Sequence, residues 1–374
     1  MSLRIGIVRI GIDARAAAEV AAGRGRFVRE LLRALARRDD PYEFVLYARK
    51  SWREGELDER FRWRLLPAPD PLWNVQAGFA AQSHSDVFFS TNSYLTAWFT
   101  RLPTALYVHD LIAWEAPESA QPRAVKIERV TIRPALRRAA RVLCNSRSTR
   151  NDLVRRFPAV ERKCAVVPLA AGDRFAQKPP DEELAAARQR YDLRGPFVLS
   201  IGTLEPRKNL ARLIDAFAAL SPEVRRDHVL ALVGPRGWDD AAIVGRASKL
   251  GGAVRVLGHV PDADLNSLYR LCTVFCYPSL YEGFGLPVLE AMQAGAAVLT
   301  SRVSSLPEVG GEGARYADPR SVEEIRDGLA ALLASGDERA RLGERALRQA
   351  ARFSWARTAA GIAGHLAELA DSRS

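Results

Sequence analysis

The chain has 374 residues, enough for two domains, and its 48% hydrophobic and 26% charged content is typical of a globular protein. It has no run of about eighteen apolar residues, and Arg4, Arg9, Asp13 and Arg15 interrupt its start, so neither a membrane span nor a secretory signal is expected. The formal charge of +11 comes from residues 1–170, which hold 29 Lys and Arg against 18 Asp and Glu. We therefore expect a cytoplasmic protein with one strongly basic half.

The first half of the chain alternates apolar runs with helical patterns, which predicts a parallel sheet covered by helices. The predicted strands are Arg4 to Ile12, Phe44 to Tyr47, Val87 to Ser90, Ala105 to Val108, Val142 to Cys144 and Ala165 to Val167. These strands indicate a Rossmann-like domain over residues 1–172.

Two glycines, Gly23 and Gly25, precede a helical run in this domain. This is the position of a glycine-rich loop that covers phosphates or a sugar, and a plain turn at the start of the helix is the alternative. The segment lacks the third glycine and the ribose-binding acid of a dinucleotide fingerprint, so a dehydrogenase is not expected.

The basic excess is densest from Arg123 to Lys163, which makes this region a candidate contact for an anionic membrane surface. The alternative is a solvated, arginine-rich helical face. A nucleic-acid groove is not expected, because no aromatic platform or recognised binding motif accompanies these cations.

The second half predicts another parallel sheet, after a linker with a short helix at residues 173–195. Its predicted strands are Phe197 to Ile201, Val229 to Val233, Val254 to Leu257, Val274 to Tyr277 and Ala297 to Thr300. They indicate a second Rossmann-like domain over residues 196–353. Open parallel sheets bind ligands beyond the carboxyl ends of their strands, so we expect a site in a cleft between the two domains.

The motif GTLEPRKN follows the first strand of the second domain and places Arg207 and Lys208 at a strand end. Two cations at this position can neutralise a diphosphate whose charge grows as it leaves. The alternative is that Arg207 pairs with Glu205 and that Lys208 caps a helix.

A second motif, at residues 279–290, predicts a strand, a loop and then a helix that begins near Pro287. Gly283 and Gly285 let the loop approach a ligand, and the amides at the helix start favour an anion such as phosphate. Glu282 and Glu290 can then accept hydrogen bonds from different hydroxyls of one ligand. Alternatively, Glu282 caps the helix and Glu290 is a solvated carboxylate.

No metal site or cofactor is expected. Asp262 and Asp264 follow Pro261 at a helix start, where they fit a helix cap, and Ser305 with Glu308 fits a capping box. The cysteines lack metal-ligand spacing and are expected to be buried free thiols: Cys144, Cys164, Cys272 and Cys276.

The motifs EGFGLPVLEAMQAG and GTLEPRKN together resemble those of the retaining family-four (group 1) glycosyltransferases of the twin-Rossmann (GT-B) type. The resemblance covers nearly the whole chain. It implies two Rossmann-like domains facing each other across a cleft, the first for the acceptor and the second for the nucleotide-sugar donor. It also implies that the C-terminal helix, residues 354–374, crosses back to the first domain; packing on its own domain is the alternative.

The resemblance implies a role for several residues. Glu282 contacts the transferred sugar, Glu290 binds the ribose, and Arg207 and Lys208 hold the diphosphate. His109 contacts the donor sugar or steadies positive charge through its carbonyl, although a histidine after a strand is usually only packed. The further donor-binding residues are Gly283, Phe284, Gly285, Leu286, Val260, Thr203, Gly23 and Gly25.

Two positions depart from the pattern of the family. Many members have arginine where Thr203 stands, and a small or aliphatic residue where Arg24 stands. The acceptor side is expected at the strand ends formed by residues 89–94 and 145–148.

The expected activity is retaining, metal-independent transfer of a hexosyl unit to a hydroxyl acceptor by front-face substitution. The motifs SSLPEV, at residues 304–309, and GTLEPRKN resemble those of bacterial mannosyl- and rhamnosyltransferases of surface-polysaccharide assembly. The first expectation is therefore mannose from GDP-mannose, followed by a dTDP- or UDP-sugar. The acceptor would be a lipid-linked or growing polysaccharide at the inner face of the membrane. A nucleotide-sugar epimerase and a non-catalytic carbohydrate or nucleic-acid binder remain alternatives.

Overall fold

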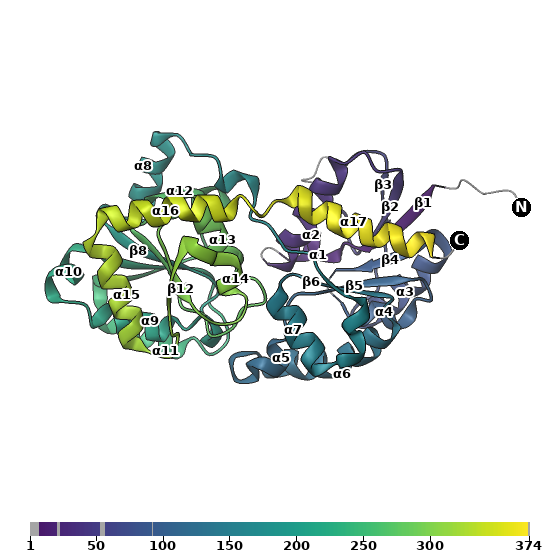
Figure 1. Cartoon of the computed structure of the whole chain (residues 1–374), viewed down its shortest axis with the longest axis horizontal. Helices are drawn as coiled ribbons and strands as arrows, with labels where there is room; N and C mark the ends of the chain where they lie inside the picture. Colours follow the sequence, from purple (N-terminus) through teal and green to yellow (C-terminus); the bar gives the residue numbers. More distant parts are fainter. Residues whose placement is uncertain (1–6, 21–22, 53–56, 92, 373–374) are drawn as a thin grey trace, which may run out of the picture. The chain divides into compact units, whose positions relative to one another are not determined.

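The computed structural model describes residues 7–20, 23–52, 57–91 and 93–372 (Figure 1). These residues form two compact units. The first combines the chain up to Ala113 with Arg123–Leu169 and the C-terminal segment from Ser354, and the second combines Trp114–Pro122 with Ala170–Phe353. Each unit folds around its own sheet.

The described part of the first unit holds a seven-stranded sheet of order β3-β2-β1-β4-β5-β6-β7, in which every pairing is parallel. Its central strands are apolar because helices cover both of their faces. The strands are β1 (Val8–Asp13), β2 (Tyr42–Ala48), β3 (Phe61–Leu65), β4 (Val87–Ser90), β5 (Thr104–Val108), β6 (Arg141–Cys144) and β7 (Cys164–Val166).

The helices of this unit lie on both faces of its sheet, with α2 and α17 on one face and α3, α4 and α6 on the other (Figure 1). The helices are α1 (Arg15–Glu19), α2 (Arg24–Ala36), α3 (Leu72–His84), α4 (Thr96–Phe99), α5 (Ile112–Glu115), α6 (Pro122–Arg138), α7 (Arg147–Arg156) and α17 (Trp355–Asp371), with the 3-10 turns η1 (Pro117–Ser119) and η2 (Pro158–Lys163). The turn η1 and the last residues of α5 fall in the second unit.

The C-terminal helix α17 packs against α2 of the first unit, as the resemblance implied. Ser354 caps the helix by accepting a hydrogen bond from the amide of Arg357. The hydroxyl of Thr358 donates to the carbonyl of Pro168 at 2.7 Å. The prediction that this helix returns to the first domain is therefore confirmed.

The described part of the second unit holds a six-stranded, all-parallel sheet of order β10-β9-β8-β11-β12-β13. Its strands are β8 (Phe197–Ile201), β9 (Val229–Val233), β10 (Val254–Gly258), β11 (Val274–Tyr277), β12 (Val298–Ser301) and β13 (Ala314–Ala317). Its helices are α8 (Asp181–Arg190), α9 (Leu210–Ala218), α10 (Pro222–Asp227), α11 (Ala241–Lys249), α12 (Asp262–Leu271), α13 (Leu286–Gln293), α14 (Leu306–Gly310), α15 (Val322–Ala334) and α16 (Gly336–Ala350), with the 3-10 turns η3 (Asp173–Phe175), η4 (Pro206–Lys208), η5 (Gly251–Ala253) and η6 (Gly311–Gly313).

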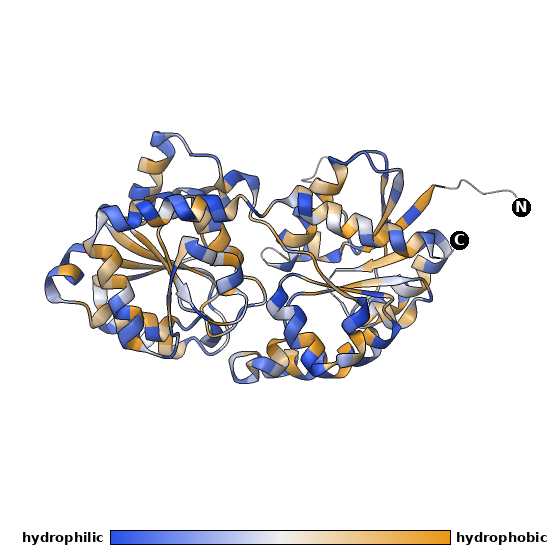
Figure 2. Ribbon diagram, viewed as in Figure 1, coloured by the Kyte–Doolittle hydropathy of each residue, from blue (hydrophilic) through white to orange (hydrophobic). Residues whose placement is uncertain are grey.

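Hydrophobic residues concentrate in the strands, and the helices turn their hydrophilic residues outward (Figure 2). In the second unit, Leu213 and Phe217 of α9 pack with Leu230 of β9 and Ile325 of α15 in one buried cluster. In the first unit, Tyr47 and Trp73 belong to a similar cluster under α3. These cores hold the strand ends, and therefore the loops that follow them, in place.

All eleven predicted strands are present, although the part of the first one before residue 7 lies outside the described residues. The prediction missed β3 and β13, which are edge strands. The four cysteines are free thiols, but only Cys144 and Cys276 are fully buried, whereas Cys164 and Cys272 are partly exposed. Among the described helices, none combines the length and the apolar character needed to cross a membrane.

Candidate functional site

The loop between β11 and α13 depends on a glycine and a proline at particular positions. Gly285 precedes the helix with a φ of 101°, in the left-handed region that favours glycine. Pro287 lies in the first turn, where its missing amide hydrogen costs no hydrogen bond. The hydroxyl of Ser305 is 2.9 Å from both carbonyl oxygens of Glu282 and Phe284, so a neighbouring loop fixes this turn.

Glu282 is a buried carboxylate held by four side chains. Its Oε1 accepts hydrogen bonds from Lys208 Nζ at 2.7 Å, from the Tyr277 hydroxyl at 2.9 Å and from the Ser279 hydroxyl at 2.8 Å. Its Oε2 lies 2.7 Å from the guanidinium of Arg207. Burial alone would raise the pKa of Glu282, but the two cations outweigh burial and lower this pKa to about 2. Glu282 is therefore ionised at neutral pH.

The two cations come from the η4 turn that follows β8. Burial, followed by repulsion from Arg207, lowers the pKa of Lys208, although Glu282 partly offsets both effects. Arg207 also pairs with Glu205 at 2.7 Å, as the alternative interpretation expected, in addition to its contact with Glu282. Its carbonyl accepts the amide hydrogen of Leu280 at 2.9 Å. The structure therefore joins the two predicted motifs into one charged cluster.

Glu290 lies one turn into α13 and is only 2% exposed. It accepts a hydrogen bond from the hydroxyl of Tyr269 in α12 at 2.9 Å. The alternative of a solvated helical carboxylate is therefore wrong for Glu290. Burying a carboxylate is unfavourable unless it makes hydrogen bonds. The hydrogen bond from Tyr269 offsets part of this cost at Glu290.

The other predicted donor-binding residues of the second unit lie in three separate segments of the chain. Gly283, Phe284, Gly285 and Leu286 form the turn itself, and Phe284 packs edge-on against Phe353 at 5.8 Å between ring centroids. Thr203 follows β8, and Val260, which is 3% exposed, lies between β10 and α12. No hydrogen bond or ion pair is recorded between Glu282 and either Thr203 or Val260 in the described chain.

The predicted helix caps at Asp262, Asp264 and Ser305 are wrong. Both aspartates lie inside the first turn of α12, where Asp262 pairs with Arg174 at 2.8 Å and Asp264 accepts from the hydroxyl of Tyr191 at 2.6 Å. Ser305 makes no side-chain cap on α14, because its hydroxyl donates to the turn before α13 instead. Among the described residues, no cluster of three potential metal ligands occurs.

In the first unit, His109 follows β5 and is fixed from two sides. Its Nε2 lies 2.8 Å from the carbonyl of Thr91, which can only accept, so Nε2 carries the hydrogen and donates it. The amide group of Asn145 donates to the backbone carbonyl of His109 at 2.7 Å. Burial, with the nearby charge of Arg24, lowers the pKa of His109 to about 4. The imidazole is therefore neutral at pH 7.

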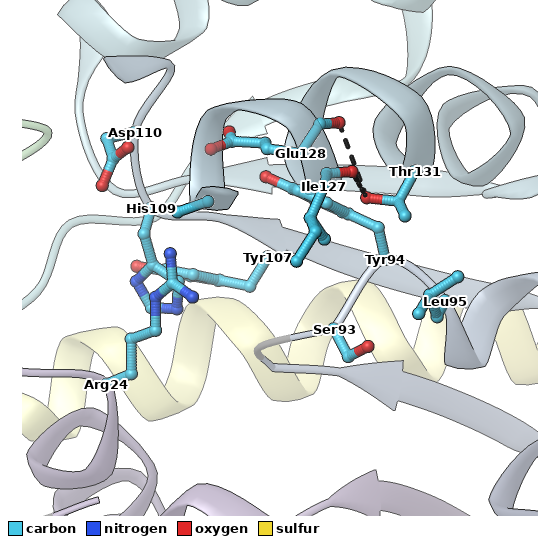
Figure 3. Close-up of a pocket in the computed structure, with 11 residues that line it drawn as sticks. Arg24, Ser93, Tyr94, Leu95, Tyr107, His109, Asp110, Ile127, Glu128 and Thr131 are labelled. Atoms are coloured by element: carbon cyan, nitrogen blue, oxygen red, sulfur yellow. Dashed lines mark hydrogen bonds between the residues drawn. The ribbon is translucent and has the colours of Figure 1, made fainter. Parts of the chain in front are cut away.

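His109 also lines a cavity of about 220 Å³ in the first unit (Figure 3). The cavity lies among the start of α2, the segment before α4, the end of β5 and one face of α6. From the expected acceptor segments, Ser93 and Tyr94 reach it, whereas Asn92 lies outside the described residues. Residues 145–148 do not line it.

Gly23 and Gly25 lie at the start of α2. Gly23 has a φ of 53°, and a Cβ on Gly25 would lie 1.7 Å from the carbonyl oxygen of Val20. Gly25 therefore has a structural reason to be glycine, as the alternative of a plain turn expected. A contact of either glycine with a ligand remains a prediction.

The sequence did not reveal the roles of several residues that shape these sites. Ser305 acts through tertiary hydrogen bonds, which no local pattern indicates. Arg24 and Glu128 meet at the cavity from distant helices. Glu128 did carry a signal, because it is the single acid in the basic helix α6.

Comparisons with known proteins identify the family of the chain. Residues 181–349 match the family model of the group 1 glycosyl transferases, and residues 21–170 match that of glycosyltransferase family 4. The chain is 36% identical over 298 residues to O-antigen chain mannosyltransferase B of Escherichia coli, covering 78% of this chain and 76% of that protein.

Solved structures share the fold. Sucrose-phosphate synthase of Thermosynechococcus elongatus superposes with a TM-score of 0.77 at 20% identity, covering 98% of this chain and 100% of that one. HepE of Anabaena, solved in complex with UDP-glucose, superposes with a TM-score of 0.77 at 17% identity, covering 97% and 100%. The two parallel sheets and the returning C-terminal helix are thus the GT-B architecture. The chain belongs to the group 1, family-four glycosyltransferases, which are retaining hexosyltransferases, and is related to bacterial O-antigen mannosyltransferases.

Proposed function

We propose that this glycosyltransferase moves a mannosyl unit from GDP-mannose to a hydroxyl of a lipid-linked or growing polysaccharide. The observation that carries the proposal is the buried cluster in which Arg207 and Lys208 hold Glu282 ionised beside the turn that begins α13. The mannose assignment is supported by the relative in O-antigen synthesis. A UDP- or dTDP-sugar is the second candidate, and the UDP-glucose complex of HepE supports a UDP-sugar.

In this proposal, the second unit binds the donor. Glu282 accepts hydrogen bonds from the transferred sugar, Glu290 from the ribose, and the main chain near Val260 binds the base. Arg207, Lys208 and the amides of Gly285 and Leu286 stabilise the negative charge of the diphosphate as the bond to the anomeric carbon breaks. Loss of one such contact costs about 3–4 kcal/mol of transition-state stabilisation.

The first unit would bind the acceptor and contact the donor sugar through His109. The acceptor hydroxyl attacks the anomeric carbon from the face that the diphosphate leaves, so the configuration is retained. The leaving phosphate oxygen takes the proton of the hydroxyl. The protein chiefly positions the reactants and stabilises charge, and no protein nucleophile is needed.

A thermal-shift series with nucleotides and nucleotide sugars tests the donor first, because selective binding stabilises the folded state by mass action. We expect GDP and GDP-mannose to raise the unfolding temperature more than the corresponding UDP and dTDP compounds. Incubation with GDP-mannose and an alkyl α-mannoside should then yield a disaccharide with an α-linkage. If the donor is converted to an epimer and no disaccharide forms, the protein is instead an epimerase.

We further propose that α6 contacts an anionic membrane surface. This helix carries six Lys and Arg residues and one acid, and its Val130 is 62% exposed. Other cations of the basic region have partners within the unit: Arg138 donates to the carbonyl of Thr100, and Lys163 to that of Leu136. The exposed cations left on α6 include Arg123, Lys126 and Arg137.

Sedimentation with liposomes tests this proposal. Liposomes with anionic phosphatidylglycerol should retain the protein at low salt, and those of phosphatidylcholine should not. The triple charge reversal of Arg123, Lys126 and Arg137 to Glu should abolish retention. The matched control reverses three exposed arginines of α16: Arg341, Arg345 and Arg348. Equal loss of retention in both triple variants would contradict a role for α6.

A further inference from the structure

Several polar side chains line the cavity of the first unit. Arg24, Tyr94 and Glu128 line it, and within the described part of the chain the structure records no hydrogen bond or ion pair for any of these side chains. Asp110 also lines it, with one carboxylate oxygen accepting the amide hydrogen of Ile112 at 3.2 Å. In Figure 3, Arg24 lies next to His109, with the carboxyl groups of Asp110 and Glu128 nearby. A buried polar group without a hydrogen-bond partner is unfavourable, so a ligand that forms hydrogen bonds with such groups binds more tightly.

The size of the cavity limits the ligand. Pockets for drug-sized ligands measure roughly 300–1,000 Å³. The cavity of about 220 Å³ is smaller and suits a single sugar ring rather than a nucleotide. Side chains of Tyr94, Tyr107 and Ile127 supply apolar surface against which the faces of such a ring can pack.

The charges of the cavity limit the ligand further. Arg24 is its single cation among the lining residues, and it faces the carboxyl groups of Asp110 and Glu128. Burial, reinforced by Asp110 and opposed by Arg24, raises the pKa of Glu128 to about 8. Burial also raises the pKa of Tyr94 well above its usual value. At neutral pH the cavity therefore has one positive charge, one negative charge, and neutral groups that can donate or accept.

We propose that this cavity binds one uncharged pyranose ring of the acceptor, and that Glu128 recognises its hydroxyl groups. This inference rests on the proposed function, because it names the chemical class of the acceptor. A phosphorylated or carboxylated sugar is disfavoured, because the carboxylate of Asp110 would repel it and compete with it for Arg24. A hydroxyl-rich neutral ring can instead donate to Asp110 and both donate to and accept from Glu128 and Tyr94.

The position of Glu128 on α6 favours this role. Ala124, Ile127 and Thr131 lie on the same face of the helix and also line the cavity. The hydroxyl of Thr131 donates to the carbonyl of Ile127 at 2.8 Å, so its hydrogen is already used. Glu128 is thus the group of this helix face that can still donate a hydrogen bond. Arg24, the first residue of α2, completes the cavity from the opposite helix.

Acceptor kinetics with an alkyl α-mannoside and its 6-phosphate provide the test, at saturating GDP-mannose or whichever donor the enzyme uses. Glu128→Ala should raise the acceptor KM about tenfold and change kcat less than threefold, because one or two hydrogen bonds are lost. Glu128→Gln should restore most of the affinity, because the amide also donates and accepts. The native enzyme should use the 6-phosphate at least tenfold less efficiently than the neutral mannoside. Glu161→Ala, on the exposed turn η2 of the same unit, is the matched control.

The outcomes separate the two proposals. An unchanged acceptor KM in Glu128→Ala, or a preference for the phosphorylated sugar, would overturn the cavity assignment and leave the glycosyltransferase function intact. The cavity assignment would also be overturned if the enzyme uses a donor but transfers sugar to no neutral alkyl glycoside. Failure of the native protein to use any nucleotide sugar would overturn the proposed function itself. The nucleotide-induced thermal shift of each variant shows that it is folded.

Discussion

Lys208 Nζ lies 2.7 Å from Glu282 Oε1, and the side chains of both residues are only 10% exposed. They come from two motifs 74 residues apart in the chain. A buried ion pair contributes little net stability, but removal of one partner leaves the other charge buried and uncompensated. This pair therefore couples the stability of the second unit to the geometry of the proposed donor site.

Lys208→Met should destabilise the protein by about 3–5 kcal/mol, because Glu282 would lose one of its buried charged partners. The double variant Lys208→Met with Glu282→Gln should recover much of this loss without recovering turnover. Chemical denaturation and the transfer rate measure the two effects. The exposed pair Lys178 and Asp181 is the control, and Lys178→Met should leave the unfolding midpoint unchanged. A stable Lys208→Met variant with normal turnover would contradict the assignment.

Ser305→Ala should weaken donor binding as well as stability. It removes two hydrogen bonds to the carbonyls of Glu282 and Phe284, at a cost of about 1–3 kcal/mol. The turn before α13 would then be less well held, so we expect about a tenfold rise in donor KM at unchanged acceptor KM. Ser221→Ala, which removes a helix cap far along the chain at α10, is the matched control. Equal changes of both KM values would show that Ser305 acts only through general stability.

Gly25→Ala should destabilise the first unit by about 1–3 kcal/mol, because the new Cβ would overlap the carbonyl oxygen of Val20. The start of α2, including Arg24, would have to shift. Gly245→Ala, in the interior of α11 with open space around it, should instead stabilise the protein by about 0.5–1 kcal/mol. Thermal unfolding of the two variants measures the contrast. If Gly25→Ala has the same stability as the native protein, the backbone at the start of α2 can move enough to accept the new Cβ.

The stability of the protein should depend on pH through Glu128. Its folded pKa of about 8 lies above the ordinary value of 4.5, so the folded state keeps a proton that the unfolded state releases between these values. This contribution is fully present below pH 4.5 and is lost as the pH rises to 8. Glu128→Gln, which has no proton to lose, should therefore gain stability relative to the native protein between pH 5 and pH 8. Unfolding temperatures across this range measure the difference.

The ionisation of His109 makes stability depend on pH in the opposite direction. Its folded pKa of about 4 lies below the ordinary value of 6.5, so its contribution is present above pH 6.5 and is lost as the pH falls to 4. The comparison of Glu128→Gln with the native protein cancels this effect, because both contain His109. Glu161→Gln controls for the loss of one exposed carboxylate. A difference for Glu128→Gln that does not change between pH 5 and pH 8 would contradict the prediction.

The sequence predicted the central strands of both sheets because these strands are buried on both faces and are therefore continuous apolar runs. It missed β3 and β13, whose sequences Phe61–Leu65 and Ala314–Ala317 mix arginines with apolar residues. Both strands lie at the edge of a sheet, where part of the surface meets solvent and no continuous apolar run is needed. Position at an edge is not sufficient for such an error, because the edge strands β7 and β10 were predicted.

The local structure of the turn before α13 was also predictable. Gly285, Pro287 and the start of α13 follow from backbone preferences, which act between neighbours in the chain. The predicted caps at Asp262, Asp264 and Ser305 were wrong, because tertiary partners compete with the local hydrogen bonds of a helix start. Ser305 donates to two carbonyls more than twenty residues earlier in the chain.

The sequence by itself determined the alternation of strands and helices, the two sheets and the motif residues of the proposed donor site, because each depends on short-range patterns. Only the tertiary structure decided that Glu282 pairs with Lys208, that Glu290 is buried, and that Arg24 and Glu128 share one cavity. These relationships set burial and charge, which depend on groups far apart in the chain. The physical reason is that a carboxyl group has the same chemistry in every sequence, whereas its pKa and its partners are fixed by packing.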